Sequence, residues 1–149
     1  MRGVMRRSLR QRTERKWLLA AEPDVLEELR RLRARVTHVT GALAATSDGV
    51  VLAHDTAFEA EGVAALTAAA LGVAQSLAGA TGRGTFRELL VRGENGYVAT
   101  YAAGSTAVLT VLAGDRTNVG RLHMEARRSG ARLADLVGLA LSRAEQPQP

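Results

Sequence analysis

The stretch AEGVAALTAAALGVAQSLAGAT, residues 60–81, decides the fold because it predicts a helix that is apolar on two sides. One apolar stripe at helical spacing contains Val63, Leu66, Ala70, Val73 and Leu77. A second stripe, about 150° around the helix at about 100° per residue, contains Ala64, Ala68, Leu71, Gln75 and Ala78. A helix that is apolar on both sides is buried on both sides.

Each of the two apolar sides of this helix must therefore pack against another element or another chain. We expect the stripe that includes Val63 to face a sheet, and the stripe that includes Leu71 to face a second copy of the chain, because alanines let two helices approach closely. A helix sandwiched within one monomer and a membrane span are the alternatives. Residues 62–82 are long enough to cross a bilayer, but the stretch is rich in alanine and contains polar residues such as Gln75 and Ser76.

On either side of this helix, short turns separate runs of strand-forming residues. Residues 38–46 and 50–54 flank Ser47-Asp48-Gly49, which predicts a hairpin. After the helix come three runs at residues 85–92, 97–102 and 106–113, separated by Glu94-Asn95-Gly96 and Ala103-Gly104-Ser105. Connections this short predict an antiparallel meander.

The outer segments predict two more amphipathic helices. Pro23 and the acids beside it suit the first turn of a helix over residues 22–36, which could extend back to Trp17. A stripe of small and apolar residues predicts a last helix over 117–143, with Thr117 or Asn118 as its N-cap. The order is α-β-β-α-β-β-β-α, which indicates the α+β class.

Composition sets limits on the kind of protein. A length of 149 residues suits one domain, and aromatic residues make up only 3% of the chain, so small aliphatic side chains must build the core. The chain has no cysteine, which excludes disulfides and thiolate zinc sites. We see no secretory signal at the N-terminus and expect a cytoplasmic protein.

Positive charge is concentrated at the N-terminus. Residues 1–16 contain seven basic side chains and one acidic side chain, whereas the rest of the chain has 13 basic and 14 acidic residues. We expect a disordered basic extension over 1–16, one domain over 17–143 and a frayed tail over 144–149. A basic arm can bind nucleic acid or anionic lipid. However, aromatic residues are not interleaved with the charges, so we expect no nucleic-acid partner and only indirect membrane contact.

No pattern of catalytic or metal-binding residues emerges. Residues 79–84, GATGRG, run from a helix into a strand, whereas phosphate-binding loops run from a strand into a helix, so a helix C-cap is expected. The three histidines, His38, His54 and His123, are too dispersed for a metal motif. We therefore expect no enzyme activity, no cofactor and no metal.

Taken together, the element order resembles the Roadblock family of dynein light chain-like proteins. The local matches are ALAATSDGVVLA, LAGATGRG and GYVATYAAGSTAVLTVLAG, within residues 22–143. The chain is most similar to the bacterial branch, which includes Mgl-type regulators of Ras-like GTPases and Roadblock subunits of actinobacterial conservons. Conservon operons typically also encode a sensor kinase-like protein and a small GTPase.

The resemblance implies a five-stranded antiparallel sheet with two helices on one face and one on the other. It also implies a homodimer formed through residues 60–81 and 85–92. The expected interface residues are Ala64, Ala68, Leu71, Gln75, Ala78, Phe86 and Leu89. Candidate contacts to a partner are Arg83, Arg87 and Arg92, although a solvated face is the simpler interpretation of these arginines. The implied function is regulation or scaffolding of a small Ras-like GTPase, and the alternative is an interaction subunit for a sensor kinase or another Roadblock protein.

Overall fold

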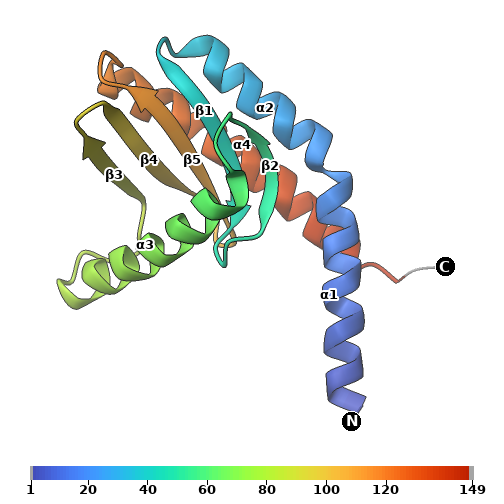
Figure 1. Cartoon of the computed structure of the whole chain (residues 1–149). Helices are drawn as coiled ribbons and strands as arrows, with labels where there is room; N and C mark the ends of the chain where they lie inside the picture. Colours follow the sequence, from blue (N-terminus) through green and yellow to red (C-terminus); the bar gives the residue numbers. More distant parts are fainter. Residues whose placement is uncertain (1, 148–149) are drawn as a thin grey trace.

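A computed structural model describes residues 2–147 of the chain (Figure 1). Four helices and five strands lie in this part of the chain. In chain order they are α1 (Arg2–Ala20), α2 (Glu22–Arg35), β1 (Val39–Thr46), β2 (Val51–Asp55), α3 (Ala60–Ala80), β3 (Glu88–Gly93), β4 (Gly96–Ala103), β5 (Ala107–Gly114) and α4 (Val119–Glu145).

The strands form one antiparallel sheet in the order β2-β1-β5-β4-β3. The predicted hairpin joins β1 to β2, where the backbone N–H of Thr46 donates to the carbonyl of Val50 at 2.8 Å. Gly49 in this turn has a φ of 96°, a conformation that glycine adopts without strain. The predicted meander links β3, β4 and β5, so the expected sheet is confirmed.

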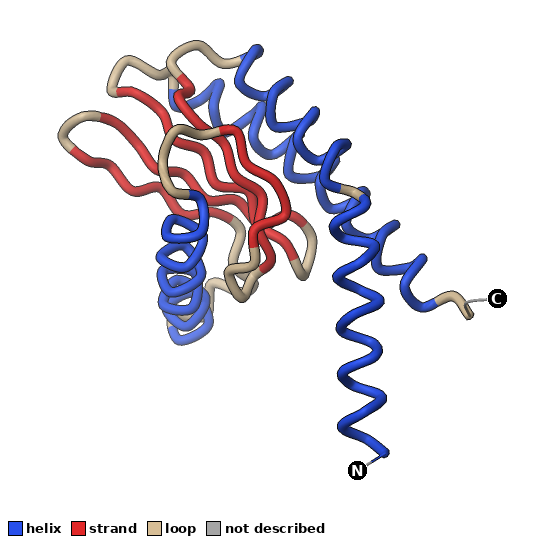
Figure 2. Tube along the Cα trace, turned by 45° about the vertical axis from the view of Figure 1, so that its right-hand side comes forward, coloured by secondary structure: helices blue, strands red, loops and turns tan. Residues whose placement is uncertain are grey.

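Two helices, α2 and α4, cover one face of the sheet, and α3 lies on the other (Figure 2). The larger core lies under α2 and α4, where Leu29 and Leu133 pack with Leu109 and Val111 of β5. The predicted α+β layers are therefore confirmed. One buried polar pair joins the two helices of this layer, because the Ser129 hydroxyl donates to Glu28 at 3.0 Å.

The ends of α2 and α4 follow local sequence signals. Asn118 caps α4, since its side-chain oxygen accepts a hydrogen bond from the backbone N–H of Arg121 at 3.0 Å. Pro23 lies in the first turn of α2. A proline at this position cannot donate to the carbonyl four residues earlier, so the helix is interrupted at Ala21 instead of continuing back to Trp17.

The N-terminal extension differs from our expectation of disorder over residues 1–16. Residue 1 lies outside the described part, and residues 2–20 form α1. Arginine, leucine, methionine and glutamine favour helix, and no proline interrupts the segment. The C-terminal end of α1 packs on α4, where the Trp17 ring lies 5.7 Å from the guanidinium of Arg143.

The other end of the chain is also more ordered than we expected. We predicted a frayed tail over residues 144–149, but α4 continues to Glu145 and ends at Gln146. Residues 148 and 149 lie outside the described part. The extra turn of α4 lies where α1 packs, since Arg10 forms a 3.7 Å ion pair with Glu145.

Candidate interaction surface

The two sides of α3 are oriented opposite to our prediction. Ala64 and Leu71, which we expected to contact a second copy, are 1% and 3% exposed and pack against Leu43 and Val108 of the chain's own sheet. Leu66, Val73 and Leu77, which we expected to face the sheet, are 74%, 70% and 63% exposed. The faces were therefore assigned wrongly, although both stripes exist.

Close packing explains why the alanine side faces inward. Small side chains at Ala60 and Ala64 let α3 approach β1, and Leu71 fills the remaining space beside Phe86. The turn of the first hairpin also lies close to α3. A Cβ on Gly49 would lie 3.5 Å from both the Ala64 carbonyl and the Ala68 Cβ. Apolarity alone did not distinguish the two stripes, whereas side-chain size does.

The predicted interface residues accordingly divide into three groups. Ala64, Leu71 and Phe86 lie in the chain's own core and are not available to a partner. Ala68, Ala78 and Leu89 are half-buried, and Gln75 is exposed.

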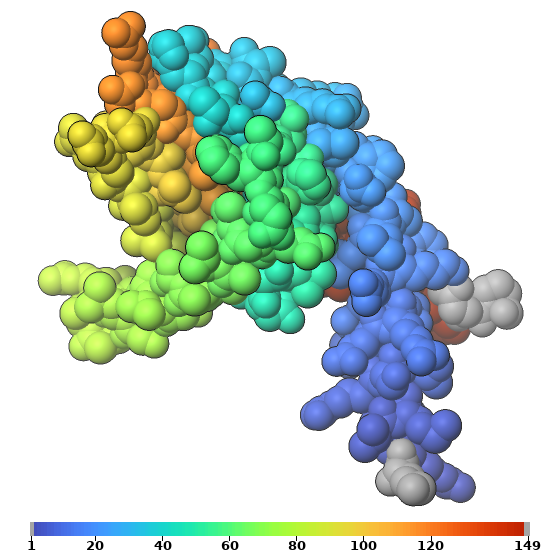
Figure 3. Space-filling view, in the orientation of Figure 1, coloured from blue at the N-terminus to red at the C-terminus, as the bar shows by residue number. Residues whose placement is uncertain are grey.

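An open apolar groove of about 380 Å³ lies beside α3. This helix packs mainly against β1 and β2, so part of the same face of the sheet toward β3 remains open (Figure 3). One wall of the groove comes from Leu66 and Ala70, and the sheet contributes Leu89, Val91 and Val98. We use the name α3 surface for the exposed apolar side chains of α3 together with those of the adjoining loop and strand, which are Phe58, Leu66, Val73, Leu77 and Val91.

Strand β3 is the edge of the sheet next to this groove, because its hydrogen bonds go to β4 alone. An edge strand presents backbone N–H and C=O groups that can pair with another strand. The α3 surface and the β3 edge together therefore offer both apolar area and backbone hydrogen bonds to a protein partner.

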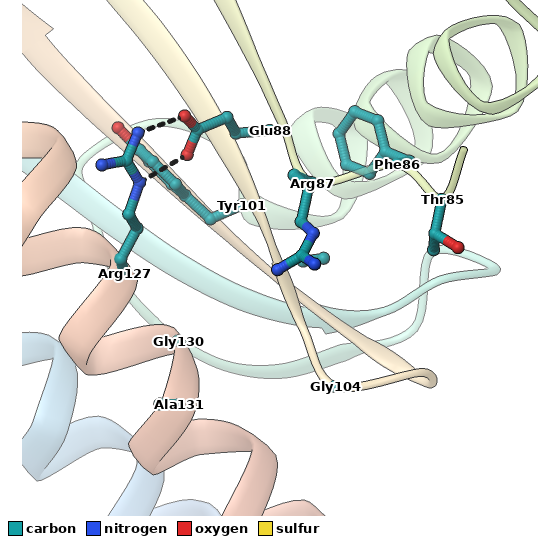
Figure 4. Close-up of a pocket in the computed structure, with 10 residues that line it drawn as sticks. Thr85, Phe86, Arg87, Glu88, Tyr101, Gly104, Arg127, Gly130 and Ala131 are labelled. Atoms are coloured by element: carbon teal, nitrogen blue, oxygen red, sulfur yellow. Dashed lines mark hydrogen bonds and ion pairs between the residues drawn. The ribbon is translucent and has the colours of Figure 1, made fainter. Parts of the chain in front are cut away.

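The opposite face of β3 carries a polar cluster that is already paired (Figure 4). Arg127 of α4 donates two hydrogen bonds to Glu88, one of them at 3.0 Å from its Nε. These bonds lower the pKa of the Glu88 carboxyl below its ordinary value of 4.5. Because its charges satisfy each other, the cluster ties the β3 edge to α4 and offers no free base or nucleophile.

Tyr101 and His123 form a second pair nearby, with the Tyr101 hydroxyl 2.7 Å from His123 Nδ1. Burial raises the pKa of Tyr101, and the Glu88 carboxylate adds to the increase. The phenol therefore keeps its proton within this bond. This bond fixes the position of α4 over β4.

The remaining candidates occupy separate places. Gly82 and Gly84 have φ values of 68° and 86°, and the N–H of Arg83 donates to the Ala78 carbonyl, so the expected C-cap is confirmed. Arg83, Arg87 and Arg92 are all exposed, and Arg92 lies over the Tyr97 ring at 6.0 Å. Within residues 2–147, no group of three metal-binding side chains comes together.

The Roadblock/LC7 domain model matches residues 25–113, which is more than half of the chain. The chain belongs to the Roadblock/LC7 family. The matched segment begins in α2 and ends in β5, so it contains α3 and the β3 edge but not α1. The expected family is thus confirmed, and the basic helix lies outside the segment that defines it.

Bacterial and archaeal proteins are among the relatives of this Roadblock chain. The gliding protein MglB from Thermus thermophilus is 25% identical and superimposes with a TM-score of 0.70, covering 82% of this chain and 92% of its own. An MglB with a tetrameric arrangement is 24% identical, with a TM-score of 0.76, covering 81% of this chain and 93% of its own. An uncharacterized protein, MJ1340, from Methanocaldococcus jannaschii is 29% identical over 97 residues, 64% of this chain and 84% of its own.

One helix of this Roadblock chain, α3, meets the length and composition criteria for crossing a membrane. Only 17% of the most apolar 18-residue segment of this helix is buried. The buried residues of α3 contact the sheet, so α3 packs as a helix of the domain and its other side is open. The unusual exposure of its large apolar side chains therefore indicates a missing cover, and this is the strongest functional signal in the domain.

Proposed function

We propose that this Roadblock protein is a homodimeric, non-enzymatic regulator or scaffold that binds a small Ras-like GTPase in a bacterial signalling or polarity system. The observation that carries the proposed dimer is the α3 surface beside the open β3 edge. We also propose that the protein acts in the cytoplasm, where such GTPases are found.

A second copy of the chain is the proposed cover of the α3 surface. Leu66, Val73 and Leu77 lie in one line along α3, so two helices placed side by side would bury all three pairs. Each such side chain stabilises the assembly by about 1.5–3 kcal/mol when it is fully buried. Pairing of the two β3 edges would add backbone hydrogen bonds.

The corrected interface differs from the one expected from sequence. Leu66, Val73 and Leu77 replace Ala64 and Leu71 as the helix contacts, and Leu89 and Val91 contribute from β3. Leu89 is common to both versions. The half-buried alanines, Ala68 and Ala78, lie at the margin of the sheet-facing side.

Binding of a GTPase rests on family membership and on the MglB relatives. The resemblance to Mgl-type regulators implies a GTPase partner, and the MglB relatives, one of them with a tetrameric arrangement, support this proposal. Arg83, Arg87 and Arg92 are exposed beside the proposed interface and are our candidate contacts to an acidic surface of the GTPase. The structure describes no free base near them, so the proposed role is to hold or reshape the GTPase.

Co-purification with a Ras-like GTPase from the same genome, loaded with GDP or with a non-hydrolysable GTP analogue, tests this function. We expect a stable complex with at least one nucleotide state, with two Roadblock chains in each complex by light scattering. Replacing Arg83, Arg87 and Arg92 with glutamine should weaken the complex without changing the Roadblock dimer. A dimer that binds a sensor kinase-like protein or another Roadblock chain, but no GTPase in either state, would favour the alternative function.

A further inference from the structure

Helix α1 is a basic arm that projects from the domain (Figures 1 and 3). None of its residues is buried, and every side chain from Arg2 to Arg12 is exposed. Its last turns pack against α4, while its first turns extend away from the sheet. The arm carries seven basic residues and Glu14, whereas the remaining chain is close to neutral.

The positive charges surround the arm instead of forming one face. At about 100° per residue, the widest interval between neighbouring basic side chains around the helix is roughly 80°. The basic positions are Arg2, Arg6, Arg7, Arg10, Arg12, Arg15 and Lys16. Four of these residues lie on the free part of the arm and outside the ion pairs with Glu14 and Glu145, namely Arg2, Arg6, Arg7 and Arg12. They leave no interval wider than roughly 140°, so cations lie on opposite sides of the arm, which suits a partner with an anionic wall on each side.

The distribution of charge around the arm distinguishes between anionic membranes and nucleic acids as partners. A helix that lies on an anionic membrane needs one apolar face to insert, but Val4, Met5 and Leu9 of α1 are interleaved with arginines. Single-stranded nucleic acid binds to stacked aromatic side chains. The one aromatic residue of the arm, Trp17, is occupied by Arg143 of α4.

Groove dimensions distinguish duplex DNA from duplex RNA as the partner of the arm. The major groove of B-form DNA is about 12 Å wide and admits an α-helix, whose diameter is about 10–12 Å. The major groove of A-form RNA is too narrow for side chains to enter. In the DNA groove, phosphates line both walls, which matches charges on all sides of the arm.

We propose that α1 is a DNA-binding arm that lies in the major groove of duplex DNA and neutralises phosphates on both walls. Arg2, Arg6, Arg7 and Arg12 supply the contacts on the free part of the arm. Arg10 has a different role, because it pairs with Glu14 at 3.2 Å and with Glu145 of α4 at 3.7 Å. The pair with Glu145 joins the arm to the domain, whereas the pair with Glu14 lies within α1. From sequence we expected no nucleic-acid partner, because aromatic residues are not interleaved with the charges.

Fluorescence anisotropy of the full chain with a labelled 20-base-pair duplex of arbitrary sequence tests the proposal. The test variant carries Arg2→Gln, Arg6→Gln, Arg7→Gln and Arg12→Gln, because glutamine keeps the helix propensity. The matched control removes four exposed arginines of the domain, with Arg30→Gln, Arg83→Gln, Arg116→Gln and Arg132→Gln. Both variants have the same net charge.

We expect the arm variant to bind at least tenfold more weakly at 50 mM salt and the control to change less than about threefold. Four phosphate contacts would weaken wild-type binding roughly 150-fold between 50 and 200 mM salt, and the arm variant should lose most of this salt dependence. Equal weakening in both variants would overturn the proposal, as would absence of saturable DNA binding by the wild type. Sedimentation with phosphatidylserine vesicles that requires the arm arginines, without DNA binding, would assign the arm to membranes instead. The wild-type salt dependence decides the question even if a variant fails to fold.

Discussion

Glu88 shows how a single side chain holds an edge strand in place. It lies at the start of β3, and its carboxylate accepts two hydrogen bonds from Arg127 of α4. The sequence separates these residues by 39 positions, and neither is part of a recognisable motif. Their pairing depends on the register of β3 and the rotation of α4, which local patterns do not determine.

The lowered pKa of Glu88 predicts a pH-dependent contribution to stability. A carboxyl whose pKa is lower in the folded state than in the unfolded state stabilises the fold above its unfolded value and loses this effect as the pH falls through its folded value. We therefore expect wild type to have a higher Tm than Glu88→Gln at pH 7, and the difference to shrink below about pH 4.5. Thermal melts from pH 7 to pH 3 measure it. A difference that persists unchanged at pH 3 would contradict the assignment.

Two glycines give opposite predictions for the same substitution. Gly96 has a φ of 149°, and a Cβ there would lie 2.1 Å from the Ala113 carbonyl. Gly96→Ala should therefore destabilise the fold by at least about 2 kcal/mol. Gly72 lies in α3 with nothing within 4 Å of its Cβ position, so Gly72→Ala should stabilise the fold by about 1 kcal/mol. Chemical denaturation of both variants measures the two changes, and a stable Gly96→Ala protein would show that the β4–β5 backbone can shift.

At the level of elements, sequence patterns predicted which helices and strands form, but not always which side of a helix faces the core. Asn118 and Pro23 located helix starts because capping depends on neighbouring residues. The Asp48-Gly49 turn likewise located the first hairpin. For α3 the pattern showed two apolar stripes, and choosing between them required knowing that the gap above β1 accepts alanine better than valine or leucine.

Helix α3 consequently gives a paired test of its two sides. Leu66→Asp combined with Val73→Asp places charges on exposed positions, so each monomer should remain folded while the proposed dimer dissociates. Leu71→Asp buries an unpaired carboxylate in the chain's own core, which should cost several kcal/mol and lower the Tm strongly. Light scattering and circular dichroism of both variants distinguish the outcomes. A folded monomer from Leu71→Asp would reverse the assignment of the two sides again.

On the scale of the whole molecule, the domain and its basic arm meet along α4, where the last turns of α1 pack. The charge changes near residue 16, within α1, and the boundary that we placed there stays a prediction. The helical form of the arm was missed, since it depends on weak intrinsic propensity and on docking of its last turns against α4. None of residues 2–15 is buried, and the ion pair of Arg10 with Glu145 is exposed on both sides.

Deleting residues 2–15 should therefore leave the domain folded. The deleted segment contains no buried residue, and exposed ion pairs contribute little to stability, so the Tm should change by only a few degrees. Deleting residues 2–21 also removes Leu18 and Ala21, which pack against the main core, and should lower the Tm further. Comparing the two melts locates the true start of the domain. Loss of cooperative unfolding in the shorter deletion would show that the arm belongs to the core. Equal Tm values for both would instead place the start at Glu22, because the docking of Trp17 and Leu18 on α4 would then add nothing to the stability of the domain.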